Sequence, residues 1–168
     1  MKRALLALLA LSLAAPAFAQ EPVGCDKFKW NLDSERAMLR SPDAARAASG
    51  TLIDKPLAGA VNVALVPFAE AKLPMAPERR PKQADSFAGF LRIAALPAAG
   101  DYRITLSQGA WIDVVQDGRY LKSGPFSGAE GCEGVRKSVT FHLPAQPFVI
   151  QVSSVQAPTI GIVITPAK

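Results

Sequence analysis

Residues 111–122 read WIDVVQDGRYLK, and this stretch sets the expectation for the whole fold. Two apolar runs, 111–116 and 119–122, flank the dipeptide Asp117-Gly118. A two-residue turn between antiparallel strands needs positive φ at both central positions, which Asp-Gly supplies at low cost. The stretch therefore predicts a tight β-hairpin.

Runs of alternating apolar and polar residues continue on both sides of this hairpin. Alternation with a period of two is typical of a strand with one buried face. Eight strands are expected, at residues 61–65, 87–93, 102–106, 111–116, 119–122, 138–143, 148–152 and 160–164. Because no helical crossovers separate them, a parallel sheet is disfavoured. The prediction is a mainly β domain over residues 59–168, an antiparallel β-sandwich or jelly roll.

The segment before this domain, residues 20–58, is predicted to be an N-terminal extension with a short helix. Residues 33–40 are expected to form that helix, with Asp33 as its cap, and Ser41-Pro42 ends it. Residues 43–48 are expected to add a second short helical turn, ending near Gly50.

Two further segments are expected to be loops. Residues 69–86 contain three prolines and several charged residues, which predicts an extended surface loop. Residues 123–134 contain four glycines and a proline, and this density predicts a loop without any regular element.

Residues 1–19 have the pattern of a secretory signal peptide. Lys2 and Arg3 precede an apolar run, and Ala17-Phe18-Ala19 places small residues where signal peptidase cleaves. The mature protein is therefore expected in the periplasm or secreted, beginning near Gln20, with no membrane span. Without Lys2 and Arg3 the formal charge of +5 falls to about +3. The basic residues are scattered, which argues against nucleic acid as a partner.

The two cysteines, Cys25 and Cys132, both lie in the mature part of the chain. In an oxidising compartment they are expected to form one disulfide. The alternatives are lipid attachment at Cys25 and a metal pair. A lipid site needs its cysteine directly after the apolar run, whereas residues 20–24 intervene here. Two cysteines with one distant histidine form a poor zinc set.

Two resemblances arise from these residues. The span 87–166 resembles the pre-peptidase C-terminal domain of secreted bacterial peptidases, through the run GDYRITL at 100–106, the strand at 111–116 and the Asp-Gly turn. This resemblance implies a β-sandwich and no activity. The whole mature chain is similar to small exported proteins of alpha-proteobacteria, through residues 23–30, 110–115 and 126–139. Some of these proteins are labelled homogentisate 1,2-dioxygenase, which implies an iron enzyme.

The sequence offers little for catalysis. The dioxygenase holds iron with two histidines and a glutamate, and this chain has one histidine, His142. That residue alternates with Phe141 and Leu143, so it is expected to face outward or lie at a sheet edge. A small hydrolase using His142 remains an alternative, but no catalytic residue, metal or cofactor is assigned.

A binding or interaction module is the favoured function. The candidate binding surface comprises Trp111, Asp113, Tyr120, Glu130 and Glu133, together with the 123–134 loop. If Ile112 and Val114 face the core, Trp111 and Asp113 share the opposite face of their strand. The acidic residues are expected to be solvated, with calcium binding as the alternative. The partner is expected to be an envelope protein or a carbohydrate-like ligand. A structural envelope protein is the third class considered.

Overall fold

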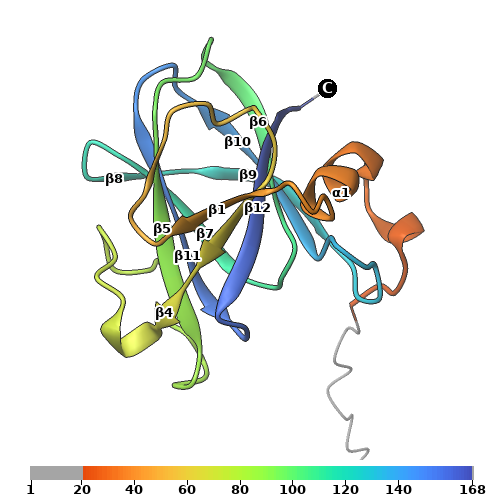
Figure 1. Ribbon diagram of the computed structural model, residues 1–168, viewed down its shortest axis with the longest axis horizontal. Coiled ribbons are helices and arrows are strands. Elements are labelled where there is room, and N and C mark those ends of the chain that lie inside the picture. Colours follow the sequence, from red (N-terminus) through yellow and green to blue (C-terminus); the bar gives the residue numbers. More distant parts are fainter. Residues whose placement is uncertain (1–20, 168) are drawn as a thin grey trace, which may run out of the picture.

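A computed structural model describes residues 21–167, and the proposed signal peptide at 1–19 lies outside the described residues. The protein is a β-sandwich of two mixed sheets (Figure 1). Sheet I has the order β1-β3-β12-β6-β10-β9, and sheet II has the order β2-β5-β11-β7-β8, with β4 paired to β5. The mainly β fold class predicted from the alternating runs is confirmed.

The strands of sheet I are β1 (Ala45–Ala48), β3 (Val61–Ala64), β12 (Thr159–Pro166), β6 (Gly100–Leu106), β10 (Lys137–Leu143) and β9 (Ser123–Gly128). The strands of sheet II are β2 (Leu52–Ile53), β5 (Phe87–Ile93), β11 (Phe148–Val155), β7 (Trp111–Gln116), β8 (Arg119–Leu121) and β4 (Val66–Pro67). The helices are α1 (Asp33–Leu39) and the short 3₁₀ turns η1 (Cys25–Lys27) and η2 (Phe68–Glu70).

The expected hairpin is present between β7 and β8. Asp117 and Gly118 have φ values of 49° and 69°, as a two-residue turn between twisted strands requires. Gln116 pairs with Arg119 directly across this turn. Ile112 and Val114 point into the core, so Trp111, Asp113 and Val115 lie on the outer face of β7, as the alternation predicted.

The structure corrects three expectations about secondary structure. Residues 43–48 do not form a helical turn, because β1 pairs there in parallel with β3. Residues 123–134 are not all loop, because β9 pairs with β10. Pro125 has no N–H group to donate to a neighbouring strand. It is tolerated in β9 because β9 is an edge strand, which has a neighbour on one side only. Asp33 does not cap α1, since it is the first helical residue after the N-cap Leu32 and its carboxylate accepts from Asn31 Nδ2 at 2.9 Å.

The sheets are therefore mixed rather than purely antiparallel. Within residues 21–167 the eight expected strands are all present, and four others add to them: β1, β2, β4 and β9. β1 and β2 run parallel to β3 and β5, respectively. Residues 20–58 thus contribute a strand to each sheet in addition to the helix, because extended backbone at a sheet edge is stabilised by pairing with its neighbour.

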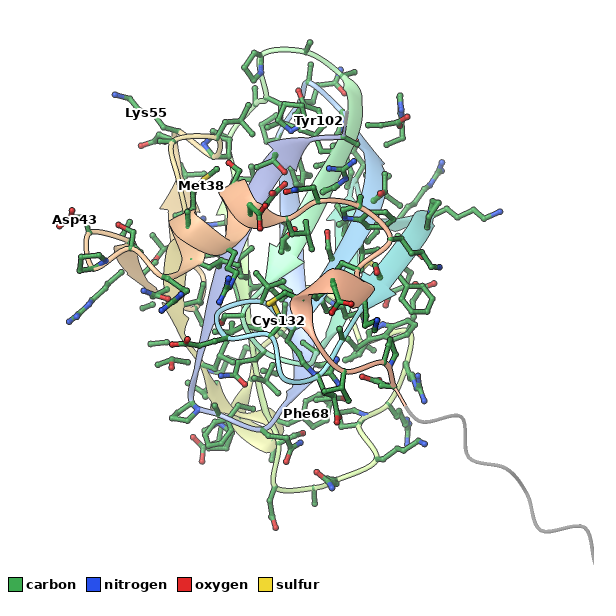
Figure 2. The ribbon with its side chains drawn as sticks, turned by 90° about the vertical axis from the view of Figure 1, so that its right-hand side faces the viewer. Met38, Asp43, Lys55, Phe68, Tyr102 and Cys132 are labelled. Atoms are coloured by element: carbon green, nitrogen blue, oxygen red, sulfur yellow. A yellow bond between two sulfur atoms is a disulfide. The ribbon has the colours of Figure 1, made fainter. Side chains whose placement is uncertain are left out.

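The N-terminal segment covers the outer face of sheet I (Figure 2). Leu32 and Leu39 pack with Val135 and Val163 in a second apolar cluster outside the main core. Gly161 on β12 permits this packing, since a Cβ there would lie 2.9 Å from Leu39 Cδ2. The cover is therefore a packed layer rather than a loose tail.

Polar contacts fix this cover to the sheet. The buried Glu35 carboxylate accepts a hydrogen bond from Thr165 Oγ1 at 2.6 Å. Trp30 Nε1 donates to Ser138 Oγ at 3.3 Å, and the Lys29 amide donates to Ser127 Oγ at 3.0 Å. These bonds satisfy polar groups on the outer face of sheet I that the cover removes from water.

The disulfide between Cys25 and Cys132 closes the N-terminal cover onto the 129–136 segment. Next to it, the Gly24 amide donates to Glu130 O and the Glu130 amide donates to Pro22 O, both at 2.8 Å. The predicted pairing of the two cysteines is therefore present, and it joins residues 107 positions apart.

We predict that the double substitution C25S/C132S lowers the free energy of unfolding by about 4–5 kcal/mol, the chain-entropy expectation for a loop of this length. Urea denaturation of a chain spanning residues 20–168 measures the change. The wild-type protein unfolded under reducing conditions is the matched control and should lose a similar amount. A loss below about 1 kcal/mol in both would contradict the prediction.

Candidate functional site

A cleft of about 710 Å³ is lined by residues of both sheets, including the edge strands β8 and β9. The first residues of β7 and the end of β11 also line it. Its inner wall is apolar and includes Ile112, Leu121, Val139 and Phe141. A cavity of this size is in the range that small-molecule ligands occupy. We refer to it below as the basic cleft.

Basic side chains dominate the rim of the basic cleft. The cations that line it are Arg79, Arg80, Lys82, Arg136 and Lys137, and the carboxylates are Glu21 and Glu78. The residues that line the cleft thus carry a formal net charge of +3. Since clefts concentrate the field of the charges around them, this one attracts anions.

Two aromatic rings accompany these cations. Phe126 on β9 is 61% exposed, an unusual state for a large apolar side chain, and Trp111 on β7 is half-buried. Arg79 Cζ lies 5.7 Å and Lys137 Nζ 5.6 Å from the Trp111 ring centre. Lys29 Nζ lies 5.5 Å from that of Phe126. The cleft therefore presents both positive charge and flat apolar surface.

Asp113 fixes the position of Trp111. Its carboxylate Oδ1 accepts a hydrogen bond from Trp111 Nε1 at 2.6 Å. Its Oδ2 accepts bonds from Gln151 Nε2 at 3.1 Å and from the amide of Glu78 at 3.4 Å. Asp113 is only 3% exposed, so the expectation that it is a solvated surface acid is wrong. It acts as a buried anchor, because three donors converge on it.

The proline-rich loop, residues 71–86, covers the outer face of sheet II at this anchor. Gln151 on β11 bonds both backbone groups of Met75, accepting from its amide at 3.3 Å and donating to its carbonyl at 3.1 Å. The hydroxyl of Tyr120 donates to Ala76 O. Together with Asp113, these side chains hold the loop, and hence Arg79, beside Trp111.

The Tyr120 hydroxyl stays protonated in this position. Loss of hydration, followed by the charges of Asp113 and Glu78, raises the pKa of Tyr120 above its usual value. A neutral phenol can donate to Ala76 O, which is the role that its contact requires.

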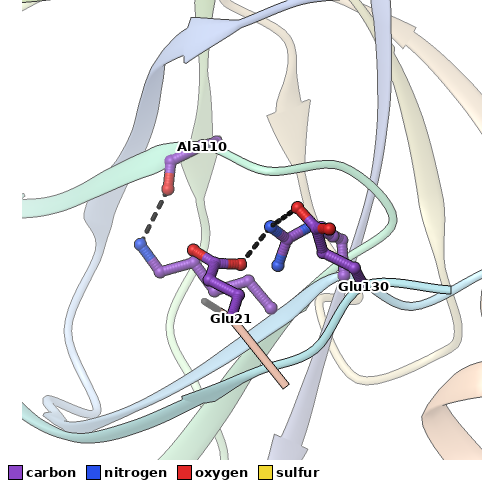
Figure 3. A network of polar contacts seen from close by, with 5 residues as sticks. Glu21, Ala110 and Glu130 are labelled. Atoms are coloured by element: carbon purple, nitrogen blue, oxygen red, sulfur yellow. Dashed lines mark hydrogen bonds and ion pairs between the residues drawn. The ribbon is translucent and has the colours of Figure 1, made fainter. Parts of the chain in front are cut away.

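Lys137 lines the cleft and is held by a hydrogen bond to the backbone. Its Nζ donates to the carbonyl oxygen of Ala110 at 2.7 Å (Figure 3). Burial, followed by the nearby charge of Arg79, lowers the pKa of Lys137 below the usual lysine value of 10.5, while Glu21 opposes the shift. An additional anion in the cleft would therefore stabilise the charged form of this lysine.

A β-bulge in β11 contributes to the cleft. The register with β5 shifts between Val152 and Val155, and Ser154 has a φ of 59°, a left-handed value that is costly for a residue with a side chain. Ser154 lines the cleft, whereas the neighbouring Ser153 hydroxyl is buried and has no hydrogen-bond partner among residues 21–167. Such strain often accompanies binding sites.

The other two predicted surface acids lie apart from Trp111. Glu130 pairs with Arg136 at 3.4 Å and does not line the cleft. Glu133 pairs with Arg40 at 3.3 Å on the N-terminal cover. Of the five predicted residues, the structure thus brings together Trp111, Asp113 and Tyr120, and it assigns Glu130 and Glu133 to the region of the disulfide.

His142 lies outside the basic cleft. Its ring is exposed, as expected from its alternation with the apolar Phe141 and Leu143. Its Nδ1 atom lies 2.9 Å from Asp101 Oδ1. Within residues 21–167, no three side chains of histidine, cysteine, aspartate or glutamate gather closely enough to hold a metal ion. In the same range, no helix has the length and apolar character needed to cross a membrane.

Sequence reasoning did not assign the cations to a site, and it included Phe126 only as part of the 123–134 loop. Arg79-Arg80 is a visible basic pair, and Arg136-Lys137 begins a strand, but the two pairs lie more than fifty positions apart. No repeating pattern in the sequence indicates that the loop between β4 and β5 lies close to the start of β10. Only the folding of the proline-rich loop across sheet II brings Arg79 and Lys137 to the same ring.

No protein-family model matches the chain, and searches of curated proteins and of solved structures also find no match.

We predict that Asp113→Ala releases the proline-rich loop, because it removes the acceptor of the Glu78 amide and of the Trp111 and Gln151 side chains. Trypsin cleavage after Arg79 and Lys82 should become about tenfold faster, as local opening of the loop becomes less costly. Mass spectrometry of timed digests locates the cuts. Asp54→Ala, at an exposed position, is the control and should cleave like wild type. Equal rates in both variants would show that Asp113 does not anchor the loop.

Proposed function

We propose that this protein is an exported, non-catalytic binding module whose basic cleft takes an anionic ligand that also carries a flat, apolar ring face. One observation carries the proposal: five cations surround an aromatic-lined cleft of about 710 Å³. Export is supported by the signal-like residues 1–19 and by the disulfide, which suits an oxidising compartment.

The cleft chemistry favours an anion over a neutral ligand. Lys137 is partly desolvated and lies near Arg79, so its charge is incompletely compensated. A bound anion would relieve this repulsion and would gain hydrogen bonds in a site with restricted hydration. Phosphate-, sulfate- and carboxylate-bearing molecules all satisfy this requirement.

The aromatic rings favour a ligand with a flat face. Trp111 is held by Asp113 and does not need to be ordered on binding, which reduces the entropic cost of stacking. Phe126 is exposed at the rim, where a bound ring would cover it. An acidic carbohydrate combines both features and agrees with the carbohydrate-like ligand expected from the sequence.

His142 does not favour a competing hydrolase function. It pairs with Asp101 on an exposed part of sheet I and does not line the cleft. The cleft itself is rich in groups that bind anions, and the residues described above position these groups.

We predict that the wild-type protein binds 1-anilinonaphthalene-8-sulfonate, an anionic aromatic probe, in the basic cleft. The double variant R79Q/K137Q should bind it about tenfold more weakly, since it removes the two cations nearest Trp111. Fluorescence titration of the folded protein gives the dissociation constants.

The matched control for this titration is R119Q/K122Q, which removes the same charge at the β7–β8 hairpin and at residues that do not line the cleft. It should bind the probe nearly as wild type does. Equal weakening in the two double variants would indicate attraction by overall charge only. Absence of binding by the wild-type protein would overturn the proposed function.

We also predict that probe affinity falls as the pH rises from 7 to 11, and that the fall begins below the usual lysine range. Deprotonation of Lys137 removes a positive charge, its pKa is lowered, and the sulfonate stays charged throughout. In K137R the guanidinium keeps its charge, so the fall should move to higher pH. The same titration in buffers of increasing pH measures it. Identical profiles for wild type and K137R would contradict this role.

A further inference from the structure

The N-terminal segment places a carboxylate of the protein itself at the basic cleft. Glu21 lines the cleft and pairs with Arg136 Nη2 (Figure 3). Its backbone position is fixed by the neighbouring bridge between Val23 and Glu130, and by the disulfide at Cys25. The Glu21 side chain is therefore delivered to the cleft by an anchored backbone.

Two carboxylates share the same guanidinium, but only one of them lies in the cleft. Glu130 also reaches Arg136 Nη2, at 3.4 Å, from the segment that follows β9. Glu21 lines the cleft, whereas Glu130 does not. Glu21 also acts on Lys137, since its charge raises the pKa of that lysine against the effect of burial.

Resting on the proposed function above, we propose that the anionic group of the ligand is a carboxylate that binds at Arg136 and Lys137 and displaces the Glu21 side chain. In this arrangement Glu21 is a tethered competitor that occupies the carboxylate subsite when the cleft is empty. The ligand class is then a ring-bearing carboxylic acid, such as a sugar acid.

The geometry makes this exchange inexpensive. The Glu21 side chain is 57% exposed and that of Arg136 is 27% exposed, so their pair is partly solvated and contributes little net free energy. A side-chain rotation suffices to release Glu21, because the anchors are on the backbone from Pro22 onward. The freed guanidinium can then bind an incoming carboxylate through two parallel N–H groups.

Isothermal titration of the mature, disulfide-bonded protein with sodium glucuronate tests the proposal. The variant Glu21→Gln should bind glucuronate about two- to fivefold more tightly than wild type, because it removes the competing charge. Glu130→Gln is the matched control: it removes a charge from the same arginine without vacating the subsite, and it should produce a smaller gain.

A coupled variant separates competition from a general change in charge. In the Arg136→Gln background glucuronate should bind more weakly, and adding Glu21→Gln should then change its affinity by less than about 1.5-fold. Glucuronamide, the uncharged analogue, should not distinguish Glu21→Gln from wild type.

The outcomes separate this inference from the proposed function. If the aromatic sulfonate binds in the cleft but glucuronate does not, the carboxylate subsite is wrong and the binding module stands. The same holds if glucuronate binds and Glu21→Gln gains no more than Glu130→Gln. If neither probe binds the wild-type protein, both proposals fall.

Discussion

Burial of the outer faces of the two sheets is the constraint on which the rest of this structure depends. A two-layer sandwich needs only its inner faces to be apolar, and outer faces are commonly left to solvent. Here the outer faces carry buried groups: Asp113 and Gln151 on sheet II, and Thr105 and Ser138 on sheet I. Each of these groups needs a partner, since an unsatisfied buried polar atom costs about 1–3 kcal/mol. The covering segments supply partners for Asp113, Gln151 and Ser138, whereas Thr105 bonds to Ser138 within sheet I.

The N-terminal cover and the proline-rich loop, which covers sheet II, both contribute residues to the basic cleft. The N-terminal cover brings Glu21 to the cleft, and the proline-rich loop brings Glu78 and Arg79 to the same cleft. Between them lie the first residues of β7 and β10, Trp111 and Lys137. The site thus combines segments distant in sequence, and its charge depends on both covers being in place. This dependence links the stability of the disulfide-bonded cover to the chemistry of the cleft.

The accuracy of the sequence-based predictions depended on how local each signal was. The hairpin at Asp117-Gly118 was correct because its φ values depend on two adjacent residues. The strands with strict alternation were found because each has one apolar face. β1 and β9 were missed because pairing, rather than side-chain burial, stabilises them: most of their residues are exposed or half-buried. Asp113 was taken for a solvated acid because its buried state depends on a loop more than thirty positions away.

The sequence by itself therefore determined the β-rich class, the main hairpin, the short helix and the pairing of two cysteines. These features depend on periodicity, on local backbone preference and on the small number of cysteines. Only the tertiary structure decided that the proline-rich loop lies across sheet II and that Arg79, Trp111, Arg136 and Lys137 surround one cleft. The physical reason is that charge and hydrogen bonding act through space. Which charged and hydrogen-bonding groups meet depends on how the covering segments pack on the sheets. This packing leaves no repeating pattern along the chain.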